Sequence, residues 1–301
     1  MLDKLTLSNM EDFRRLYCNN FRIRSYNKDF FRCYENQNFL IKFLYRKYIK
    51  LIKYNNKYIG YIWYESSTES YVKVWALYID FKFKYLINED TLSFFNNNLL
   101  NYEEIDTNEN SFILESLGFM RKNYTILLKI DTQEFNYENN SDISNENKGK
   151  IKEKLNSDKI EFSYRKCIKG MDEGLRCTLQ NDIFDKWNRI PLTIHDIYAD
   201  MAQDYYLDEY SFLGIINNEA LGYGQIIFNR NMHTIVNFGI INNFRGLGIG
   251  RIFLNEIINV AKEHKIKDLY IRVDSNNIPA INLYKSIGFK EENKIIIWER
   301  S

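Results

Sequence analysis

The sequence has few of the residues that build disulfides and metal centres. Its 301 residues include three histidines, and its four cysteines show no C-x-x-C spacing; they are Cys18, Cys33, Cys167 and Cys177. No metal site is recognisable from ligand spacing, and we expect none. Because cysteine usage of this kind fits a reducing compartment, the simplest location for the protein is the cytoplasm.

Long apolar runs and an excess of one charge are also missing. No apolar run approaches the roughly 18 residues of a membrane-spanning helix, and Asp3 and Lys4 close behind Met1 are not typical of a signal peptide. Forty-one basic and forty acidic residues leave a net charge of +1, which gives no electrostatic reason to expect a nucleic-acid or membrane partner. The chain is nevertheless 45% hydrophobic and 16% aromatic, so one large core or two smaller ones can form.

The most informative stretch begins at His233. Residues 234–241 are β-branched and aromatic, which predicts a buried strand. A glycine-rich turn follows: Arg245-Gly246-Leu247-Gly248-Ile249-Gly250-Arg251. Beyond it, apolar residues recur with helical spacing up to Ala261. At such a junction of strand, turn and helix, unpaired N–H groups and the helix dipole favour an anion such as phosphate.

Other interpretations of this turn stay open on these residues alone. The G-x-x-x-x-G-K-[ST] motif of a P-loop is missing. A Rossmann turn needs an acidic residue about 20 residues further on, and Asp274 lies near that distance. A tight connection that binds no ligand is equally compatible with the glycines.

A second motif lies downstream of the turn. Residues 277–289 have the form N-x-x-A-x-x-L-Y-x-x-x-G-F, and one helix and one strand fit between the two motifs. The R-G-x-G-x-G turn followed by this motif resembles the GCN5-related N-acetyltransferase (GNAT) family. The resemblance implies an α/β fold of the mixed, α+β-like kind, in which a twisted, mostly antiparallel sheet is flanked by helices.

Elsewhere the chain alternates strand-like and helix-like runs. The pattern predicts strands over 71–79, 125–130, 211–216, 221–228, 268–273 and 294–299, and helices over 91–100, 172–179 and 195–205.

The two halves of the chain resemble each other. Residues 55–61 parallel 217–223, and residues 116–119 parallel 286–289. We therefore expect two tandem GNAT-like domains.

The first domain is expected over residues 1–130 and the second over 159–301. Residues 131–158 are polar and rich in asparagine, which predicts a linker that cannot bury enough apolar surface to order itself.

The first half lacks the residues of both motifs. It has no glycine between Gly60 and Gly118, so it cannot form the turn, and aligning the two Gly-Phe pairs places Leu114 opposite Tyr284. We expect this half to be degenerate and structural, or to form a wall of the substrate site.

The resemblance implies acetyl-CoA as acyl donor and a small-molecule or peptide amine as acceptor. Strand backbone would pair with the pantetheine arm, the N–H groups of the turn would hold the pyrophosphate, and arginines could add charge. The implied donor-binding residues are Phe238, Gly239, Ile240, Arg245, Gly246, Leu247, Gly248, Ile249, Gly250, Arg251, Asn277 and Tyr284.

Tyr284 resembles the family's general acid, which returns a proton to the departing thiolate. A phenol with a pKa of about 10 holds its proton at neutral pH and can still donate it. Tyr284 also shares one helical face with Ala280, Leu283 and Ile287, so an ordinary core tyrosine is the alternative. Asn277 is expected to cap this helix.

The general base stays unassigned. An alkylamine with a pKa of about 10.4 costs roughly 4–5 kcal/mol to deprotonate at pH 7. Residues 232–241 contain no carboxylate, and His233 is their only titratable residue, which makes it a weak candidate. Asp274 and Glu209 stay open as well.

Two functions follow. The first is an acetyl-CoA-dependent N-acetyltransferase in which a primary amine attacks the thioester directly. The alternative is an acyl-CoA-binding sensor or scaffold that does not catalyse. The acceptor stays open among antibiotic amines, polyamines, amino acids, peptide N-termini and protein lysines.

Overall fold

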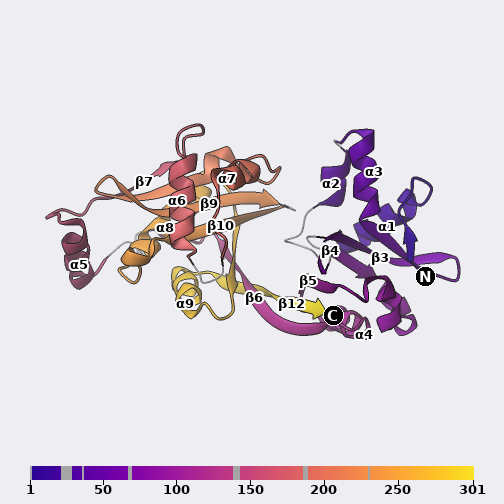
Figure 1. The fold of residues 1–301 in the computed structure, drawn as a ribbon. Coiled ribbons are helices and arrows are strands. Elements are labelled where there is room, and N and C mark those ends of the chain that lie inside the picture. Colours follow the sequence, from indigo (N-terminus) through magenta and orange to yellow (C-terminus); the bar gives the residue numbers. More distant parts are fainter. Residues whose placement is uncertain are drawn as a thin grey trace. The chain divides into compact units, whose positions relative to one another are not determined.

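The computed structural model describes residues 2–21, 29–35, 37–66, 70–137, 143–185, 189–229 and 231–301. The chain divides into two compact units (Figure 1): Met1–Ile126 with Asn293–Ser301, and Leu127–Glu292. Each unit is a sheet with helices packed on it, the mixed α/β fold that the sequence predicts. Within the described ranges, no helix is long and apolar enough to cross a membrane.

The first unit is built on the strand order β1-β2-β3-β4-β5-β12, in which only β4 and β5 run parallel. Its helices and strands are β1 (Leu2–Lys4), α1 (Met10–Phe21), α2 (Phe30–Glu35), α3 (Phe39–Lys47), β2 (Ile49–Tyr54), β3 (Lys57–Ser66), β4 (Tyr71–Ile79), the 3-10 helices η1 (Phe81–Leu86) and η2 (Glu89–Phe95), β5 (Leu99–Ile105), α4 (Asn108–Ser116) and the beginning of β6 (Met120–Asp131).

The second unit is built on the strand order β6-β11-β10-β9-β8-β7. Its helices and strands are the end of β6, α5 (Asn145–Leu155), β7 (Phe162–Lys166), α6 (Glu173–Ile183), α7 (Ile194–Met201), the 3-10 helix η4 (Asp208–Tyr210), β8 (Ser211–Ile216), β9 (Glu219–Asn229), β10 (Met232–Ile240), the 3-10 helix η5 (Asn242–Phe244), α8 (Ile249–Glu263), β11 (Asp268–Asp274), α9 (Ile278–Ile287) and the beginning of β12 (Lys290–Arg300).

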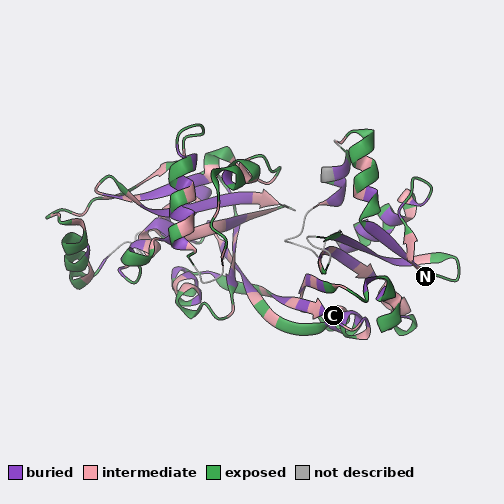
Figure 2. Cartoon of the chain, in the orientation of Figure 1, coloured by how far each residue is buried: buried purple, intermediate pink, exposed green. Residues whose placement is uncertain are grey.

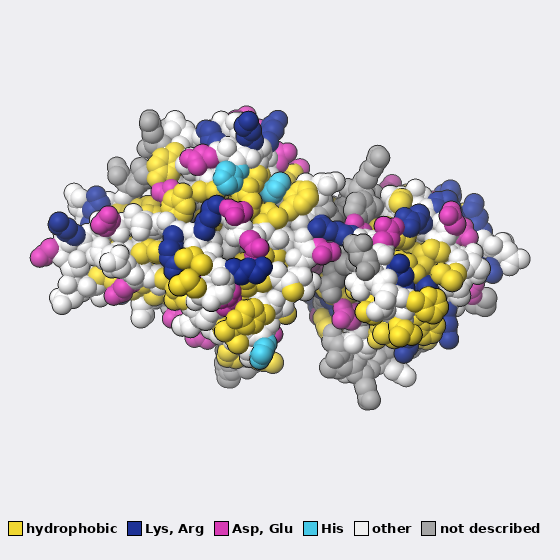
Figure 3. All heavy atoms as spheres, turned by 90° about the horizontal axis from the view of Figure 1, so that it is seen from above, with side chains coloured by type: hydrophobic (Ala, Val, Ile, Leu, Met, Phe, Trp, Pro, Cys, Tyr) yellow, Lys and Arg dark blue, Asp and Glu magenta, His cyan; other side chains and the backbone are white. Residues whose placement is uncertain are grey.

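Helices cover both faces of the second sheet. A Cβ at Gly222 would meet the Phe253 ring of α8 at 3.1 Å, whereas the ring of the next residue, Tyr223, lies under the guanidinium of Arg176 in α6. Because neighbouring residues of a strand point to opposite faces, α8 and α6 cover different faces. Figure 2 shows the central strands β8 and β9 largely buried and the outer faces of these helices exposed. In the surface view of Figure 3, side chains of both charges are interspersed, in keeping with the net charge of +1.

The C-terminal strand completes the sheet of the first unit. β12 pairs antiparallel with β5, from Ile295 opposite Ile105 to Arg300 opposite Leu100. Trp298 is 1% exposed within the core of that unit. The sequence assigned this strand to the second domain, 159–301, and that boundary is wrong for β12. The local pattern of the strand does not distinguish the two sheets, because strand periodicity carries no information about the pairing partner.

The expected linker is also partly ordered. Helix α5 lies inside 131–158, begins at a cap in which Ser144 Oγ accepts the N–H of Asn147, and ends at Asn156 in the left-handed conformation. The apolar residues Phe135, Ile143 and Ile151 are 4%, 7% and 0% exposed. Spaced along a polar sequence, these three side chains bury enough surface to order the segment on both sides of 138–142, which lie outside the described residues.

Three features repeat between the units, as the sequence similarity suggests. Both hairpins turn on an asparagine pair in the left-handed conformation, Asn55–Asn56 and Asn217–Asn218. Positive φ at both positions is what a two-residue hairpin of this type requires. Shortly after each turn, Gly60 and Gly222 lie at a register shift between the strands, and Gly118 and Gly288 end the two matching helices.

Candidate functional site

The parallel strands β10 and β11 pair over a short stretch and then separate. Pairing runs from His233–Leu269 to Ile235–Ile271, although β10 continues to Ile240 and β11 to Asp274. On its other side, β10 stays paired with β9 through Gly239 and Ile240. Beyond Ile235 the edge of β10 that faces β11 therefore offers backbone N–H and C=O groups that no strand of the described chain pairs.

A β-bulge accompanies this separation. Val236 lies opposite Gln225 and Gly239 opposite Tyr223, so two residues of β10 face one of β9, and Asn237 has a φ of 53°. An extra residue bends a strand and increases its local twist. The sequence analysis missed the bulge. Asn237 was the available signal, because asparagine adopts positive φ more readily than most residues.

The glycine turn comes next, where α8 begins. Gly246 and Gly248 have φ of 75° and 87°, and Gly248 is the N-cap of α8. A cap without a side chain leaves the first N–H groups of the helix, those of Ile249 and Gly250, without an intrahelical acceptor. A Cβ at Gly246 would meet no described atom within 4 Å, so the space beside the turn is open. This is the geometry that binds anions at helix N-termini.

The third glycine has a different role from the one expected. Gly250 lies inside the first turn of α8 and does not need positive φ. A Cβ there would contact Ile240 and Leu283 at 3.6 and 3.8 Å, which are ordinary packing distances. Only two of the three glycines are therefore required by the backbone of the turn.

Both arginines of the turn have protein partners. Arg245 donates from Nε to the Ile240 carbonyl at 2.9 Å and from its terminal nitrogen to the Ile183 carbonyl, so it ties the end of β10 to the end of α6. Arg251 donates to Ser286 Oγ at 2.5 Å, which links α8 to α9. Through these hydrogen bonds both arginines hold the turn in place.

Tyr284 packs beside the separated strands. Its ring is 6.4 Å from that of Phe238 and 6.0 Å from that of Phe289, and Phe238 in turn stacks on Phe253 at 5.7 Å. The side chain is 6% exposed, and burial raises the pKa of the phenol. Among the described residues, no hydrogen bond to its hydroxyl is found. Tyr284 is thus both a core residue and a protonated phenol with a free hydrogen-bonding group.

Asn277 caps α9, as the sequence predicts. Its side-chain oxygen accepts the N–H of Ala280 at 3.3 Å, and Pro279 lies in the first turn.

The candidate bases lie in different places. The His233 ring packs on Phe228 at 4.6 Å, and burial lowers its pKa. It is five residues before Phe238, about 16 Å along the strand at roughly 3.3 Å per residue. Glu209 is exposed in η4, where its partner Lys166 lowers the pKa of the carboxyl. Asp274 accepts the N–H of Asn276 at 2.8 Å and so shapes the turn after β11.

The sequence analysis missed a buried polar cluster on the α6 and α7 side of β9. Asp200 accepts hydrogen bonds from Arg176, from the Tyr205 hydroxyl at 2.8 Å and from Gln225 at 3.4 Å. Tyr223 is hydrogen-bonded to Gln225 and shares a 2.8 Å hydrogen bond with Ser211. Gln225 lies opposite Val236, so the cluster adjoins the bulge. Its members lie far apart in the chain, and no local motif could have grouped them.

Two donors near this cluster are buried without a partner among the described residues. They are Nε of Arg176 and Nε2 of Gln180, both on α6. Since an unpaired buried donor costs about 1–3 kcal/mol, a water or a ligand atom is expected to satisfy them when the protein works.

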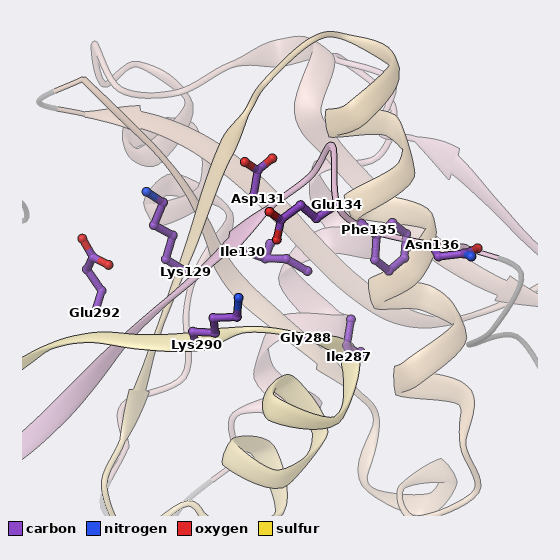
Figure 4. A pocket seen from close by; sticks show the side chains of 10 residues that line it. All are labelled: Lys129, Ile130, Asp131, Glu134, Phe135, Asn136, Ile287, Gly288, Lys290 and Glu292. Carbon is purple, nitrogen blue, oxygen red and sulfur yellow. The ribbon is translucent and has the colours of Figure 1, made fainter.

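The second unit also contains a cavity of about 520 Å³ (Figure 4). Lys129, on its wall, forms an ion pair of 3.1 Å with Asp268, the first residue of β11. The strands separate beyond Ile271, towards the other end of β11, so the cavity does not coincide with the glycine turn. Its lining residues are Lys129, Ile130, Asp131, Glu134, Phe135, Asn136, Ile287, Gly288, Lys290 and Glu292. In the part of the chain that the structure describes, no group of three or more His, Cys, Asp or Glu side chains could hold a metal ion.

The first unit has the same strand arrangement but a different edge. β4 and β5 pair in parallel from Tyr71–Leu99 to Val74–Tyr102 and then separate. Here the Tyr102 hydroxyl accepts the backbone N–H of Leu77 at 3.4 Å and lies 3.3 Å from the Leu77 carbonyl, which also accepts from Nδ2 of Asn20 at 3.5 Å. Counted from the last paired residue, Leu77 corresponds to Phe238. A side chain thus bonds the strand edge at Leu77, whereas at Phe238 no side-chain hydrogen bond to the backbone is found among the described residues.

The buried Glu104 holds that tyrosine in place. Its carboxylate accepts a short hydrogen bond from the Tyr102 hydroxyl and a 3.0 Å hydrogen bond from the N–H of Ile105. Tyr102 and Glu104 are 1% and 6% exposed.

Comparison with known families agrees with this geometry. Residues 178–289 match the acetyltransferase (GNAT) family, a range that runs from α6 to the end of the second motif. The chain carries a GNAT domain. This range includes the separated strands, the glycine turn, Asn277 and Tyr284.

Similar proteins carry related names. An N-alpha-acetyltransferase of Sulfurisphaera tokodaii is 40% identical over 58 residues, which cover 19% of this chain and 35% of that protein. The chain spans between 35% and 52% of the length of the curated relatives it matches. A GCN5-related N-acetyltransferase from Sphaerobacter thermophilus has a similar fold, with a TM-score of 0.70 at 13% identity over 100% of this chain and 95% of that one. A tandem GNAT protein from the clavulanic acid biosynthesis pathway has a TM-score of 0.56 at 8% identity, over 83% and 81% of the two chains. These two structures share the fold.

Proposed function

We propose that the protein is an acetyl-CoA-dependent N-acetyltransferase whose chemistry takes place in the second unit. One observation carries this proposal: β10 and β11 separate shortly before the glycine turn, and the N-terminus of α8 that follows the turn has no side-chain cap. The strand edge suits the amide-containing arm of such a donor. The helix N-terminus, which comes next along the chain, suits its pyrophosphate.

The residues around the separation fit this donor. The backbone of Phe238, Gly239 and Ile240 would hydrogen-bond the amides of the pantetheine arm, as a further strand would. The N–H groups of residues 246–251 would hold the pyrophosphate, and the open space at Gly246 leaves room for it. Asn277 has both a capping role and a position at the start of α9 that suits a contact with the arm. Arg245 and Arg251 would act by fixing the turn.

Tyr284 would supply the proton that the reaction requires. The amine nitrogen forms a bond to the thioester carbonyl carbon, the carbon–sulfur bond breaks, and the nitrogen loses one proton. The departing sulfur gains one proton, and a phenol with a raised pKa keeps that proton available at neutral pH. The free hydroxyl of Tyr284 and its contact with Phe238 support this assignment. The acceptor of the amine's proton stays unassigned among His233, Asp274, Glu209 and water.

We propose that only the second unit binds the donor. The first unit lacks the glycine turn, and its Tyr102 already occupies the backbone groups of Leu77. A pantetheine arm would have to displace a hydroxyl that is hydrogen-bonded to a buried carboxylate.

An acyl-CoA-binding sensor is the second candidate. It is favoured by the absence of a carboxylate from β10, where a base would be useful. A sensor would bind acetyl-CoA as tightly as an enzyme but would not release free thiol.

The test is thiol release from acetyl-CoA with a panel of amines. Peptides with a free α-amine come first, because one relative is named an N-alpha-acetyltransferase; polyamines, amino acids, an aminoglycoside and a lysine peptide follow. Release above the rate without protein, dependent on one acceptor class, supports the enzyme. Tight binding without release for every class would replace it by the sensor.

A further inference from the structure

Helix α3 of the first unit exposes its apolar side chains. Leu40, Phe39, Phe43 and Leu44 are 74%, 71%, 59% and 52% exposed, although α3 has only nine residues. We call these four residues the α3 apolar face. Figure 2 shows α3 largely exposed, and Figure 3 shows hydrophobic side chains gathered on the surface of this unit, with Lys and Arg and some Asp and Glu side chains around them.

The opposite face of α3 holds the charges. Arg46 is 7% exposed and donates to the Tyr34 hydroxyl at 2.8 Å, and Lys42 lies over the Tyr34 ring at 5.5 Å. Tyr45 packs on Phe30 at 6.3 Å. A surface helix of a globular protein normally turns its apolar stripe inward and its charges to water. In α3 the apolar face points to solvent instead. The contacts of Arg46 with Tyr34 and of Tyr45 with Phe30 hold the helix in this orientation.

The chain around α3 is basic. Between Glu35 and Glu65 there is no carboxylate, and the cations are Lys42, Arg46, Lys47, Lys50, Lys53 and Lys57. Lys47 is exposed at the end of α3, next to the apolar face. Lys50 is mostly buried over the Phe94 ring, Lys53 pairs with Asp3, and Lys42 lies over the Tyr34 ring, so Lys47 is the cation of the helix that is best placed to meet a partner. The near-zero charge of the whole chain conceals this local excess.

We propose that the α3 apolar face docks on an anionic lipid bilayer. Phenylalanine and leucine side chains enter the boundary between headgroups and acyl chains, while the adjacent Lys47 meets the phosphates. A second copy of the chain is a poorer partner for the same surface. A symmetric pair would bring Lys47 of one copy close to Lys47 of the other, with no carboxylate between Glu35 and Glu65 to compensate.

The test is cosedimentation of the full chain with vesicles. Neutral phosphatidylcholine vesicles are compared with vesicles that also contain phosphatidylglycerol, at low salt and at about 0.5 M salt, where surface charges are screened. We expect binding to the anionic vesicles at low salt and much weaker binding in the other conditions. The double variant Leu40→Ser with Phe43→Ser should bind about tenfold less or weaker still, because two inserted side chains are lost.

Two matched controls separate this effect from general damage. Leu7→Ser removes an apolar side chain of the same unit that is 67% exposed, and it should leave vesicle binding unchanged. Lys47→Glu should weaken binding to anionic vesicles several-fold, whereas Lys148→Glu, on the exposed side of α5, should not. Melting temperatures and acetyl-CoA affinity should stay the same in all four variants, since none of these side chains is buried.

Three outcomes would overturn this assignment. The wild-type chain could fail to bind anionic vesicles at low salt, or the double variant could bind as well as the wild type. In the third, light scattering would show a dimer that the double variant abolishes, without any vesicle binding, and the α3 apolar face would then belong to an interface between copies of the chain.

Discussion

Replacing Tyr284 by phenylalanine removes one hydroxyl and keeps the ring. That ring packs between Phe238 and Phe289, and no protein hydrogen bond to the hydroxyl is found among the described residues. The folded state therefore loses almost nothing, and the free energy of unfolding should change by less than about 1 kcal/mol. If the phenol donates the proton to the thiolate, turnover should fall by about 10²–10⁴, which corresponds to about 3–5 kcal/mol of activation free energy.

Three measurements on this variant separate its possible roles. The melting temperature reports packing, calorimetric titration reports acetyl-CoA affinity, and thiol release with the best acceptor of the panel reports chemistry. We expect the first to be nearly unchanged, the second to change by less than tenfold, and the third to fall steeply. Wild-type turnover in the variant would refute the role as general acid. Because burial raises the pKa of Tyr284, its proton is lost only at higher pH than for an exposed tyrosine, so the wild-type rate should not fall from this cause between pH 7 and 9.

Two further predictions follow from the fold. Calorimetry should give one acetyl-CoA per chain, and Gly248→Glu should abolish binding, because it places a side chain and a negative charge where Gly248 has a φ of 87° and caps α8; two equivalent sites, or unchanged binding by Gly248→Glu, would contradict the assignment. Trp298→Ala should destabilise the first unit by about 3–5 kcal/mol, because this 1% exposed ring completes its core from the far end of the chain; hydrogen exchange that shows equal protection of β5 in the variant and the wild type would contradict it.

The strands and helices that the sequence predicts well are those with strong local patterns. The strands over 71–79 and 211–216 have the predicted bounds, and the succession of β10, glycine turn, α8, β11 and α9 follows the two motifs. The predicted helix over 91–100 is wrong: a 3-10 helix ends at Phe95, and Leu99 begins β5. Leu99 and Leu100 fit the apolar pattern of a helix as well as that of a strand. Their pairing with Tyr71 and Val72 of β4 makes them part of a strand.

What the sequence did not predict depends on distant parts of the chain. The separation of β10 from β11 follows from a bulge whose register is set by β9, and the cluster of Arg176, Asp200 and Gln225 is assembled from three different segments. The pairing of β12 with β5 of the first unit brings together residues almost two hundred positions apart. For example, Arg300 donates from Nε to the Leu117 carbonyl at 2.9 Å. Local periodicity carries no information about such pairings.

The two units show how one strand arrangement can keep or lose a donor site. In both, a parallel pair separates after a few residues and leaves one strand edge to be satisfied, since buried backbone groups need hydrogen-bond partners. The first unit satisfies this edge internally: the Tyr102 hydroxyl accepts the N–H of Leu77 and donates to Glu104, and Asn20 donates to the Leu77 carbonyl. In the second unit the residue matching Tyr102 is Ile271, which has no polar atom to offer, and the residue matching Glu104 is Val273. The edge of β10 at Phe238 is therefore left for a ligand, ahead of the only part of the described chain where two left-handed glycines precede a helix. The first unit thus lacks the glycine turn that would hold the pyrophosphate. It also has an internal partner at the strand edge that would otherwise bind the pantetheine arm.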